Sequence, residues 1–203
     1  DHGHFHEHDH GHSHDHGAGA ADISSDAVRR SDLPPGAGRG KILYLDAPSG
    51  LAGDMIVAAL VDLGVPPSAI EHALADLGLT GFHVHFGHRE RHAIVGTSFE
   101  VHVDADPPHR DWRTIRELLE GSRLEPTAKG YALATFRRLA AAEAKVHRTS
   151  IDEVHFHEVG AVDAIVDIVA SSAALAYLGA TVVVSPLPVG RAFVRAAHGR
   201  IPL

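Results

Sequence analysis

The first residues of the chain carry a dense set of potential metal ligands. Histidine occupies every even position from 2 to 16, and Gly, Asp, Glu and Ser fill most of the positions between. Neutral imidazole binds zinc, nickel, copper and cobalt, so these side chains can chelate several ions: His2, His4, His6, His8, His10, His12, His14 and His16. A purification tag or a solvated spacer is the alternative, although a tag is usually an unbroken histidine run. The stretch predicts metal capture or storage without fixing the metal.

A second set of ligands lies between residues 155 and 167. His155 and His157 are two residues apart, so an extended segment would place both imidazoles on one face, beside Glu158. Asp163 and Asp167 are four residues apart on a very apolar helix, where unpaired carboxylates are costly to bury. A divalent metal with histidine and carboxylate ligands would satisfy them. The alternative is that the histidines are ordinary surface residues and the aspartates cap or pair locally.

A third candidate site follows the first predicted strand. Asp46 ends this strand, and a loop of small residues with Ser49, Gly50, Gly53 and Asp54 leads to the helix predicted from residue 55. Loop amides and a helix N-terminus favour an anion such as phosphate, and the two carboxylates could hold a divalent ion beside it. The loop is neither a P-loop nor a dinucleotide-binding fingerprint. A plain turn with Asp54 as a helix cap is an equal alternative.

Other histidines are weaker candidates. A predicted hairpin carries several of them, as an auxiliary metal face or simply as a polar sheet face: His83, His85, His88 and His102. Glu143 and His147 are four residues apart at the end of a helix. They fit a local ion pair at least as well as a place in the second set of ligands.

The chain that positions these groups predicts a mixed α and β domain. Apolar runs and period-two alternation indicate strands in 41–46, 82–88, 98–104, 181–190 and 191–199. Helical periodicity with Gly and Pro at the ends indicates helices in 55–64, 69–78, 112–121, 127–147 and 161–179. Asp111 is the expected N-cap of the third helix, and the fifth is apolar enough to be buried on most sides. We expect an α/β or α+β fold with one mixed sheet and several flanking helices.

Composition narrows the class of protein. The chain has 203 residues, of which 44% are hydrophobic, enough for a compact domain. It has no cysteine, so disulfides, zinc–thiolate sites and cysteine nucleophiles are excluded. The formal charge of −8 argues against nucleic-acid binding and is compatible with cation binding. Because no apolar run of 18 residues and no signal segment are found, we expect a cytoplasmic protein without a membrane partner.

Two regions are expected from this composition. Residues 1–40 are too polar and too rich in Gly, Ser and Pro to bury an apolar face, so they predict a disordered, histidine-rich metal-binding tail and linker. Residues 41–203 predict a folded domain.

Three segments resemble the signature segments of the LarC family of nickel-insertion proteins. They are KILYLDAPSGLAGDM at 41–55, EVHFHEVGAVDAIVDIV at 153–169 and SPLPVGRAFVRAAHGRIP at 185–202. The resemblance runs from Lys41 to the last residue, and the second segment is its most specific part. It implies insertion of Ni(II) into pyridinium-3,5-bisthiocarboxylic acid mononucleotide, which makes the nickel-pincer cofactor of lactate racemase. It also implies consumption of CTP and an auxiliary Mn(II) or Mg(II) ion.

The resemblance further implies an enzyme of the lyase class, a nickel chelatase or cyclometallase. Family members are longer than this chain, so we expect 41–203 to be their N-terminal domain, without the C-terminal domain that holds CTP, and the chain to be incomplete as an enzyme. The expected partners are the mononucleotide substrate and the racemase that receives the cofactor. We also expect a homo-oligomer, whose size the sequence does not reveal.

On this resemblance the tail concentrates nickel, and His155, His157 and Glu158 receive it and act in catalysis. Asp163 and Asp167 bind the metal or orient its ligands. The loop residues of the third site, Ser49, Gly50, Gly53 and Asp54, bind the cofactor phosphate or, with Asp46, the auxiliary ion. His198 lies in the third segment and is a candidate metal ligand without a local partner. The pyridinium C–H must lose a proton as the nickel–carbon bond forms, and a histidine or carboxylate is the natural base.

Two other functions remain open from the sequence. The first is a nickel store or metallochaperone without catalysis, which the histidine tail favours. The second is a metal-dependent phosphohydrolase built from the same histidine and aspartate clusters.

Overall fold

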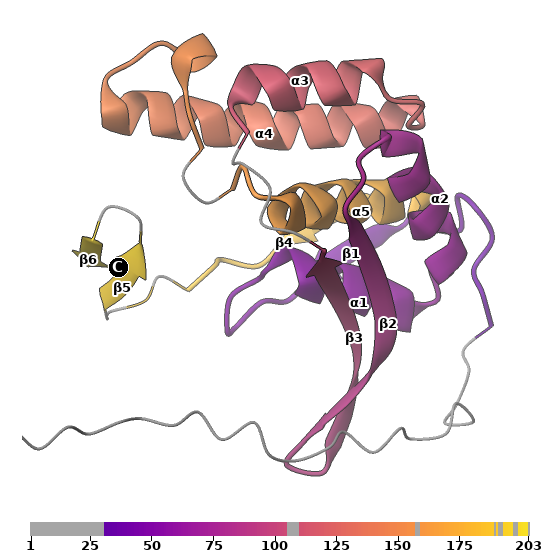
Figure 1. Ribbon diagram of the computed structural model, residues 1–203. Coiled ribbons are helices and arrows are strands. Elements are labelled where there is room, and N and C mark those ends of the chain that lie inside the picture. Colours follow the sequence, from indigo (N-terminus) through magenta and orange to yellow (C-terminus); the bar gives the residue numbers. More distant parts are fainter. Residues whose placement is uncertain are drawn as a thin grey trace, which may run out of the picture.

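The computed structural model describes residues 31–104, 110–156, 159–188, 190, 193–196 and 199–202. Its elements follow in this order: β1 (Ile42–Leu45), α1 (Gly53–Leu63), α2 (Pro67–Leu77), β2 (Phe82–Arg91), β3 (Ile94–Val103), α3 (Trp112–Gly121), α4 (Pro126–His147), a short 3-10 helix η1 (Ile151–Glu153), α5 (Val162–Leu178), β4 (Thr181–Val184), β5 (Phe193–Ala196) and β6 (Gly199–Pro202) (Figure 1). The mixed α and β class predicted from the sequence is confirmed.

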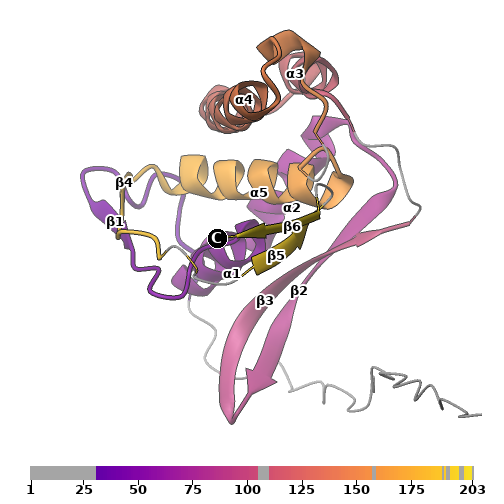
Figure 2. The same ribbon diagram turned by 90° about the vertical axis from the view of Figure 1, so that its left-hand side faces the viewer.

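The apolar helix α5 runs through the middle of the molecule. In both views the α3–α4 pair lies on one side of α5, and α1 with the β2–β3 hairpin lies on the other (Figures 1 and 2). The helix contacts α1, α2, α4 and β3. Its side chains Ile165, Val166, Val169 and Ala174 are fully buried. The predicted burial of this helix on most sides is therefore confirmed, because neighbours surround it as its composition requires.

Local signals fix the ends of the helices. The carboxylate of Asp111 accepts a 2.7 Å hydrogen bond from the Thr114 amide, so Asp111 is the N-cap of α3 as predicted. Helix α2 begins at a proline and ends before Gly78, which adopts the left-handed conformation. Helix α4 ends at His147, and its C-cap Arg148 is a non-glycine residue in the left-handed conformation with a φ of 54°.

The described strands pair two by two, whereas the sequence predicted one mixed sheet. β1 and β4 are parallel, and β2–β3 and β5–β6 are antiparallel hairpins. The β2–β3 hairpin pairs locally because Val84, Phe86, Phe99 and Val101 give it one apolar face to pack on the core, where β3 contacts α1 and α5. Its opposite face is polar.

The hairpin turn is tighter than predicted. The strands continue to Arg91 and from Ile94, through residues that were assigned to the connection. His92 and Ala93 form the two-residue turn, and both have positive φ angles, 50° and 62°. Such turns normally use Asn-Gly or Asp-Gly, so this sequence carried no local signal for one.

Aromatic packing ties the α3–α4 pair to the segment before α5. The fully buried ring of Phe136 on α4 lies 6.2 Å from the ring of Phe156.

Among the described helices, none is both long enough and apolar enough to cross a membrane.

Candidate functional site

The first turn of α1 packs directly against the second turn of α5. A Cβ atom at Gly53 would lie 2.6 Å from Cβ of Asp167 and 2.9 Å from its Oδ2, so only glycine fits this approach. The Ser171 hydroxyl donates a 3.3 Å hydrogen bond to the Gly53 carbonyl. This close crossing brings Asp54 from α1 next to Asp167 from α5.

Three carboxylates gather where the two helices meet. Asp54 lies in the first turn of α1, Asp163 in the first turn of α5 and Asp167 one turn later. Asp54 Oδ1 accepts a 2.8 Å hydrogen bond from the Met55 amide, and Asp163 Oδ1 accepts one of 2.8 Å from Ala164. The first two carboxylates are thus engaged at their own helix ends, while Asp167 faces both of them.

Asp167 has an unusual environment for a carboxyl group. Burial, with the nearby charges of Asp54 and Asp163 in addition, raises the pKa of Asp167 from 3.8 to about 6. A hydrogen bond from the Asp54 amide opposes the rise. Oδ1 of Asp167 is buried and has no hydrogen-bond partner. A carboxyl group with this pKa can accept or release a proton near neutral pH.

The carboxylates form one wall of an open cleft of about 740 Å³. The lining also includes four charged or polar residues of the β2–β3 hairpin: Arg89, Arg91, Glu100 and His102. Arg89 forms an ion pair with Glu100 on the neighbouring strand. The lining of the cleft therefore combines three carboxylates with two guanidinium groups, so it can take a ligand that carries both a cation and an anionic group.

His155 lies outside this cleft, in a short extended segment. Val154 and Phe156 on either side of it are buried, so the His155 side chain is exposed by simple alternation. Residue 155 forms an antiparallel bridge with Asp111. Hydrogen bonding to Thr114 is the main cause that lowers the pKa of Asp111, and the charge of His155 contributes to the same effect.

The bridge depends on a close crossing at Gly160. A Cβ atom there would lie 2.4 Å from the Arg110 carbonyl oxygen, and the Arg110 amide donates a 3.1 Å hydrogen bond to the Gly160 carbonyl. Glycine therefore lets the loop between His155 and α5 lie against the residues that precede α3.

The loop after β1 binds its neighbours through the backbone. Asp46 and Ser49 are exposed, and the Ala47 amide donates to Ser185 Oγ at 2.9 Å. Gly50 has a φ of 94°, as expected for a turn. The sequence predicted that the amides at the start of α1 bind an external anion. In the structure the Asp54 amide donates its hydrogen bond to the carboxylate of Asp167.

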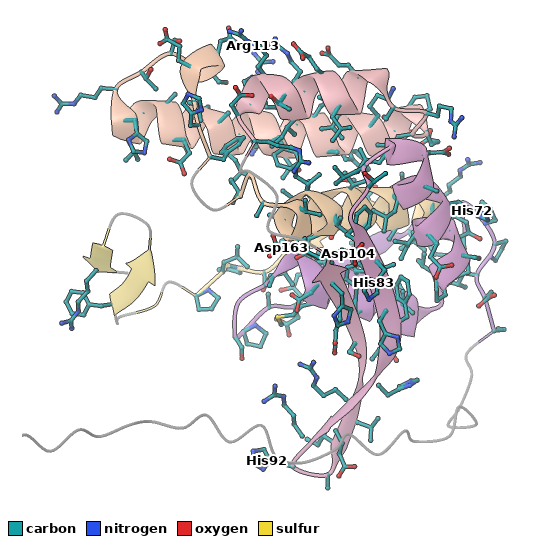
Figure 3. All side chains as sticks on the ribbon, viewed as in Figure 1. His72, His83, His92, Asp104, Arg113 and Asp163 are labelled. Carbon is teal, nitrogen blue, oxygen red and sulfur yellow. The ribbon has the colours of Figure 1, made fainter. Side chains whose placement is uncertain are left out.

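The other histidine clusters are local. The rings of His83 and His102 stack with centroids 4.9 Å apart, and His83 Nδ1 lies 3.3 Å from Asp104 Oδ1. Figure 3 shows His83 and Asp104 on the body of the hairpin and His92 at its tip. Glu143 and His147 form an i,i+4 pair at 3.2 Å. Within the described ranges, no three His, Asp or Glu side chains are arranged as a metal-binding group.

Several predicted ligands lie outside the described residues. These are His157, Glu158, His198 and the eight tail histidines from His2 to His16.

Comparison with known proteins identifies the family. A family model described as "Nickel insertion protein" matches residues 43–203. The chain belongs to the nickel insertion protein family.

Its relatives agree with this assignment. Proteins named "Putative nickel insertion protein" match from Geobacter metallireducens at 49% identity, Geobacter sp. strain M21 at 48% and Myxococcus xanthus at 47%. Each match covers 80% of this chain and 43% of the relative. The chain therefore spans less than half the length of these relatives. No solved structure matches it significantly.

The part of the chain that matches the nickel insertion family contains every described residue of the cleft. The sequence predicted that Asp163 and Asp167 share one helix face, but it did not point to Arg89 and Arg91 as lining residues of the cleft. The signal for Arg89 and Arg91 was the period-two alternation of 83, 85, 87, 89 and 91, which puts both arginines on the polar face of one long strand. Gly53 was recognised as a loop glycine, but its contact with Asp167 is tertiary and has no local signal.

Proposed function

We propose that this chain is the nickel-handling part of an enzyme that inserts Ni(II) into pyridinium-3,5-bisthiocarboxylic acid mononucleotide, with consumption of CTP in the complete protein. The family match over residues 43–203 is the observation that carries this proposal. The substrate, the role of CTP and the nickel-pincer product rest on the resemblance of the three signature segments. The same resemblance supports a racemase as the recipient of the product. A cytoplasmic location and a homo-oligomer belong to the same proposal.

Nickel is a substrate in this reaction, and we assign its reception to His155 with His157 and Glu158. Imidazole and carboxylate are suitable ligands for Ni(II). The exposed His155 is held by two buried neighbours and by the bridge to Asp111, so its backbone is fixed while its ring remains accessible.

Asp167 is the described group best suited to accept a proton. Formation of the nickel–carbon bond replaces a C–H bond of the pyridinium ring, and the released proton needs a base. A carboxylate with a pKa of about 6 is largely ionised at neutral pH and still basic enough to take the proton. Asp167 lines the same cleft as Arg89 and Arg91, and guanidinium groups suit a substrate with anionic thiocarboxylate and phosphate groups.

The carboxylates of Asp54, Asp163 and Asp167 offer the type of donor atom that an auxiliary Mn(II) or Mg(II) prefers, but not the arrangement of a binding site. Both ions prefer carboxylate oxygens, which Asp54 and Asp163 supply, and bound Mn(II) or Mg(II) would neutralise phosphate charge. The described carboxylates do not converge as a set of three ligands. We therefore assign no step to this ion.

Nickel calorimetry on the full chain tests the assignment of His155. The eight tail histidines are first replaced by glutamine, so that the tail does not mask a site in the domain. We expect one tight site in this background, and we expect the double substitution His155→Ala/His157→Ala to abolish it. His72→Ala, an exposed histidine on α2, is the matched control and should leave the site intact. A tight site that survives the double substitution would refute the assignment.

Nickel storage is the second candidate function, and the eight alternating histidines of the tail favour it. A store binds several ions per chain and loses nearly all of them when the tail histidines are replaced. An insertion protein keeps a tight site in the domain after the same change.

A further inference from the structure

The parallel pair β1–β4 has an apolar face that no described element covers. Ile42 and Tyr44 are 70% and 57% exposed, while Leu43 between them packs on the core. On the partner strand, Val182, Val183 and Val184 are 39–45% exposed. The two strands read ILYL and TVVV, without a charged residue. In Figure 2 the pair lies at one end of the molecule, beyond the end of α5.

The pair is also open along its edges. Among the described strands, β1 pairs only with β4 and β4 only with β1. Parallel strands occur almost only in sheets covered on both faces, and a sheet of two strands is marginal in water. Exposed edges normally carry lysine, proline or a bulge that prevents pairing, and neither strand contains a lysine or a proline. The pair therefore has the composition and the edges of interior strands in a larger sheet.

The length of the relatives indicates what completes the sheet. The family match begins at residue 43 and includes nearly all of β1 and the whole of β4, so the open sheet belongs to the shared region. The matched part is only 43% of the relatives from Geobacter and Myxococcus, so more than half of each lies outside it. A segment of the same polypeptide has a high effective concentration at the open edge, which an untethered second copy lacks.

We propose that polypeptide of the longer family members, beyond the part represented by this chain, completes the β1–β4 sheet. Its chemistry follows from the surface that it covers. An apolar strand pairs with the free backbone groups of an open edge. If this added strand is parallel to its neighbour, the chain must cross over the sheet to reach it, usually through a helix. That helix covers Ile42, Tyr44 and the valines of β4. The inference depends on the family assignment and not on the nickel chemistry.

Hydrogen exchange on two intact proteins tests the proposal. The amides of 42–45 and 181–184 in this chain are compared with the aligned segments in the full-length Geobacter metallireducens relative, as protection relative to intrinsic rates. We expect at least tenfold greater protection in the relative. The β2–β3 hairpin, which pairs internally, is the control segment and should be equally protected in both proteins. Equal protection of β1 and β4 in the two proteins would overturn the proposal.

A dilution series separates the proposed occupant from a second copy. Protection of β1 and β4 should persist in the relative at concentrations where sedimentation shows a monomer. Protection that disappears on dilution to monomer would refute the proposal in favour of self-association. Val183→Lys should lower protection of β1 at least tenfold when made at the aligned position of the relative. Val146→Lys, an exposed position on α4, is the matched control and should not.

Discussion

Replacement of Asp167 by asparagine should change how the stability of the domain depends on pH. Burial raises the pKa of this carboxyl group from 3.8 to about 6, so the folded state holds the proton more tightly than the unfolded state. The stabilisation is fully present below pH 3.8 and is lost as the pH rises through about 6. Asparagine keeps the shape of the side chain without the charge, and its amide can donate to the neighbouring carboxylates.

The size of the effect follows from the two pKa values. The difference between 3.8 and about 6, at about 1.4 kcal/mol per pKa unit, corresponds to about 3 kcal/mol. Asp167 lines an open cleft and is partly exposed, so solvent screens its interactions, and we expect about 1–1.5 kcal/mol. Asp167→Asn should therefore be more stable than wild type by this amount at about pH 7.5 and nearly equal to it at about pH 3.5.

Urea unfolding of both proteins in EDTA, at several pH values between these limits, measures the difference. Taking the difference between the variants cancels the titration of the other carboxylates. Glu71→Gln, which removes an exposed acid on α2 away from the cleft, is the matched control. The reasoning would be refuted if Asp167→Asn changed the free energy of unfolding equally at both ends of the range.

Three other substitutions and one control test the packing and capping of the fold by urea unfolding. Gly160→Ala places a Cβ atom 2.4 Å from the Arg110 carbonyl oxygen and should lower the free energy of unfolding by about 2–3 kcal/mol. Gly130→Ala, in an open part of α4, is the control and should raise it by ~0.5–1 kcal/mol. An unchanged free energy of unfolding for Gly160→Ala would contradict the close crossing at this residue. Asp111→Ala removes the N-cap of α3 and should cost about 1 kcal/mol, and an unchanged midpoint would argue against the cap. Phe136→Ala removes a fully buried ring and should cost ~3–5 kcal/mol, with a loss below about 1 kcal/mol inconsistent with its burial.

The sequence predicted the elements that local rules control. Helix α5 was expected at 161–179 and spans Val162–Leu178, because its apolar composition and Gly179 mark both its environment and its end. The α3 cap at Asp111 was correct for a similar reason, since a capping side chain acts only on the next turn. The strand pairing was less predictable, because the choice between one sheet and three pairs depends on which edges meet in space.

In the candidate site, too, the sequence predicted the features that local geometry controls and missed those that depend on tertiary contacts. The shared face of Asp163 and Asp167 follows from helix geometry and could be read from a spacing of four. The raised pKa of Asp167 comes first from its burial and then from the charge of Asp54, which is more than 100 residues away in sequence and is brought close by the contact at Gly53. No periodicity reports such a contact. The assignment of His155 as a nickel ligand remains a prediction.

The parallel pairing of β1 with β4 also has a consequence for the order of folding. Residues 46–180 separate the two strands, so β1 is synthesised long before its only described partner exists. The β2–β3 hairpin closes through a two-residue turn and needs no distant residue. Closing the long loop between β1 and β4 costs entropy that the intervening helices must first reduce by folding. Strand β1 therefore cannot form its described pairing until Val184 has been synthesised, whereas the hairpin can close once Val103 has been made.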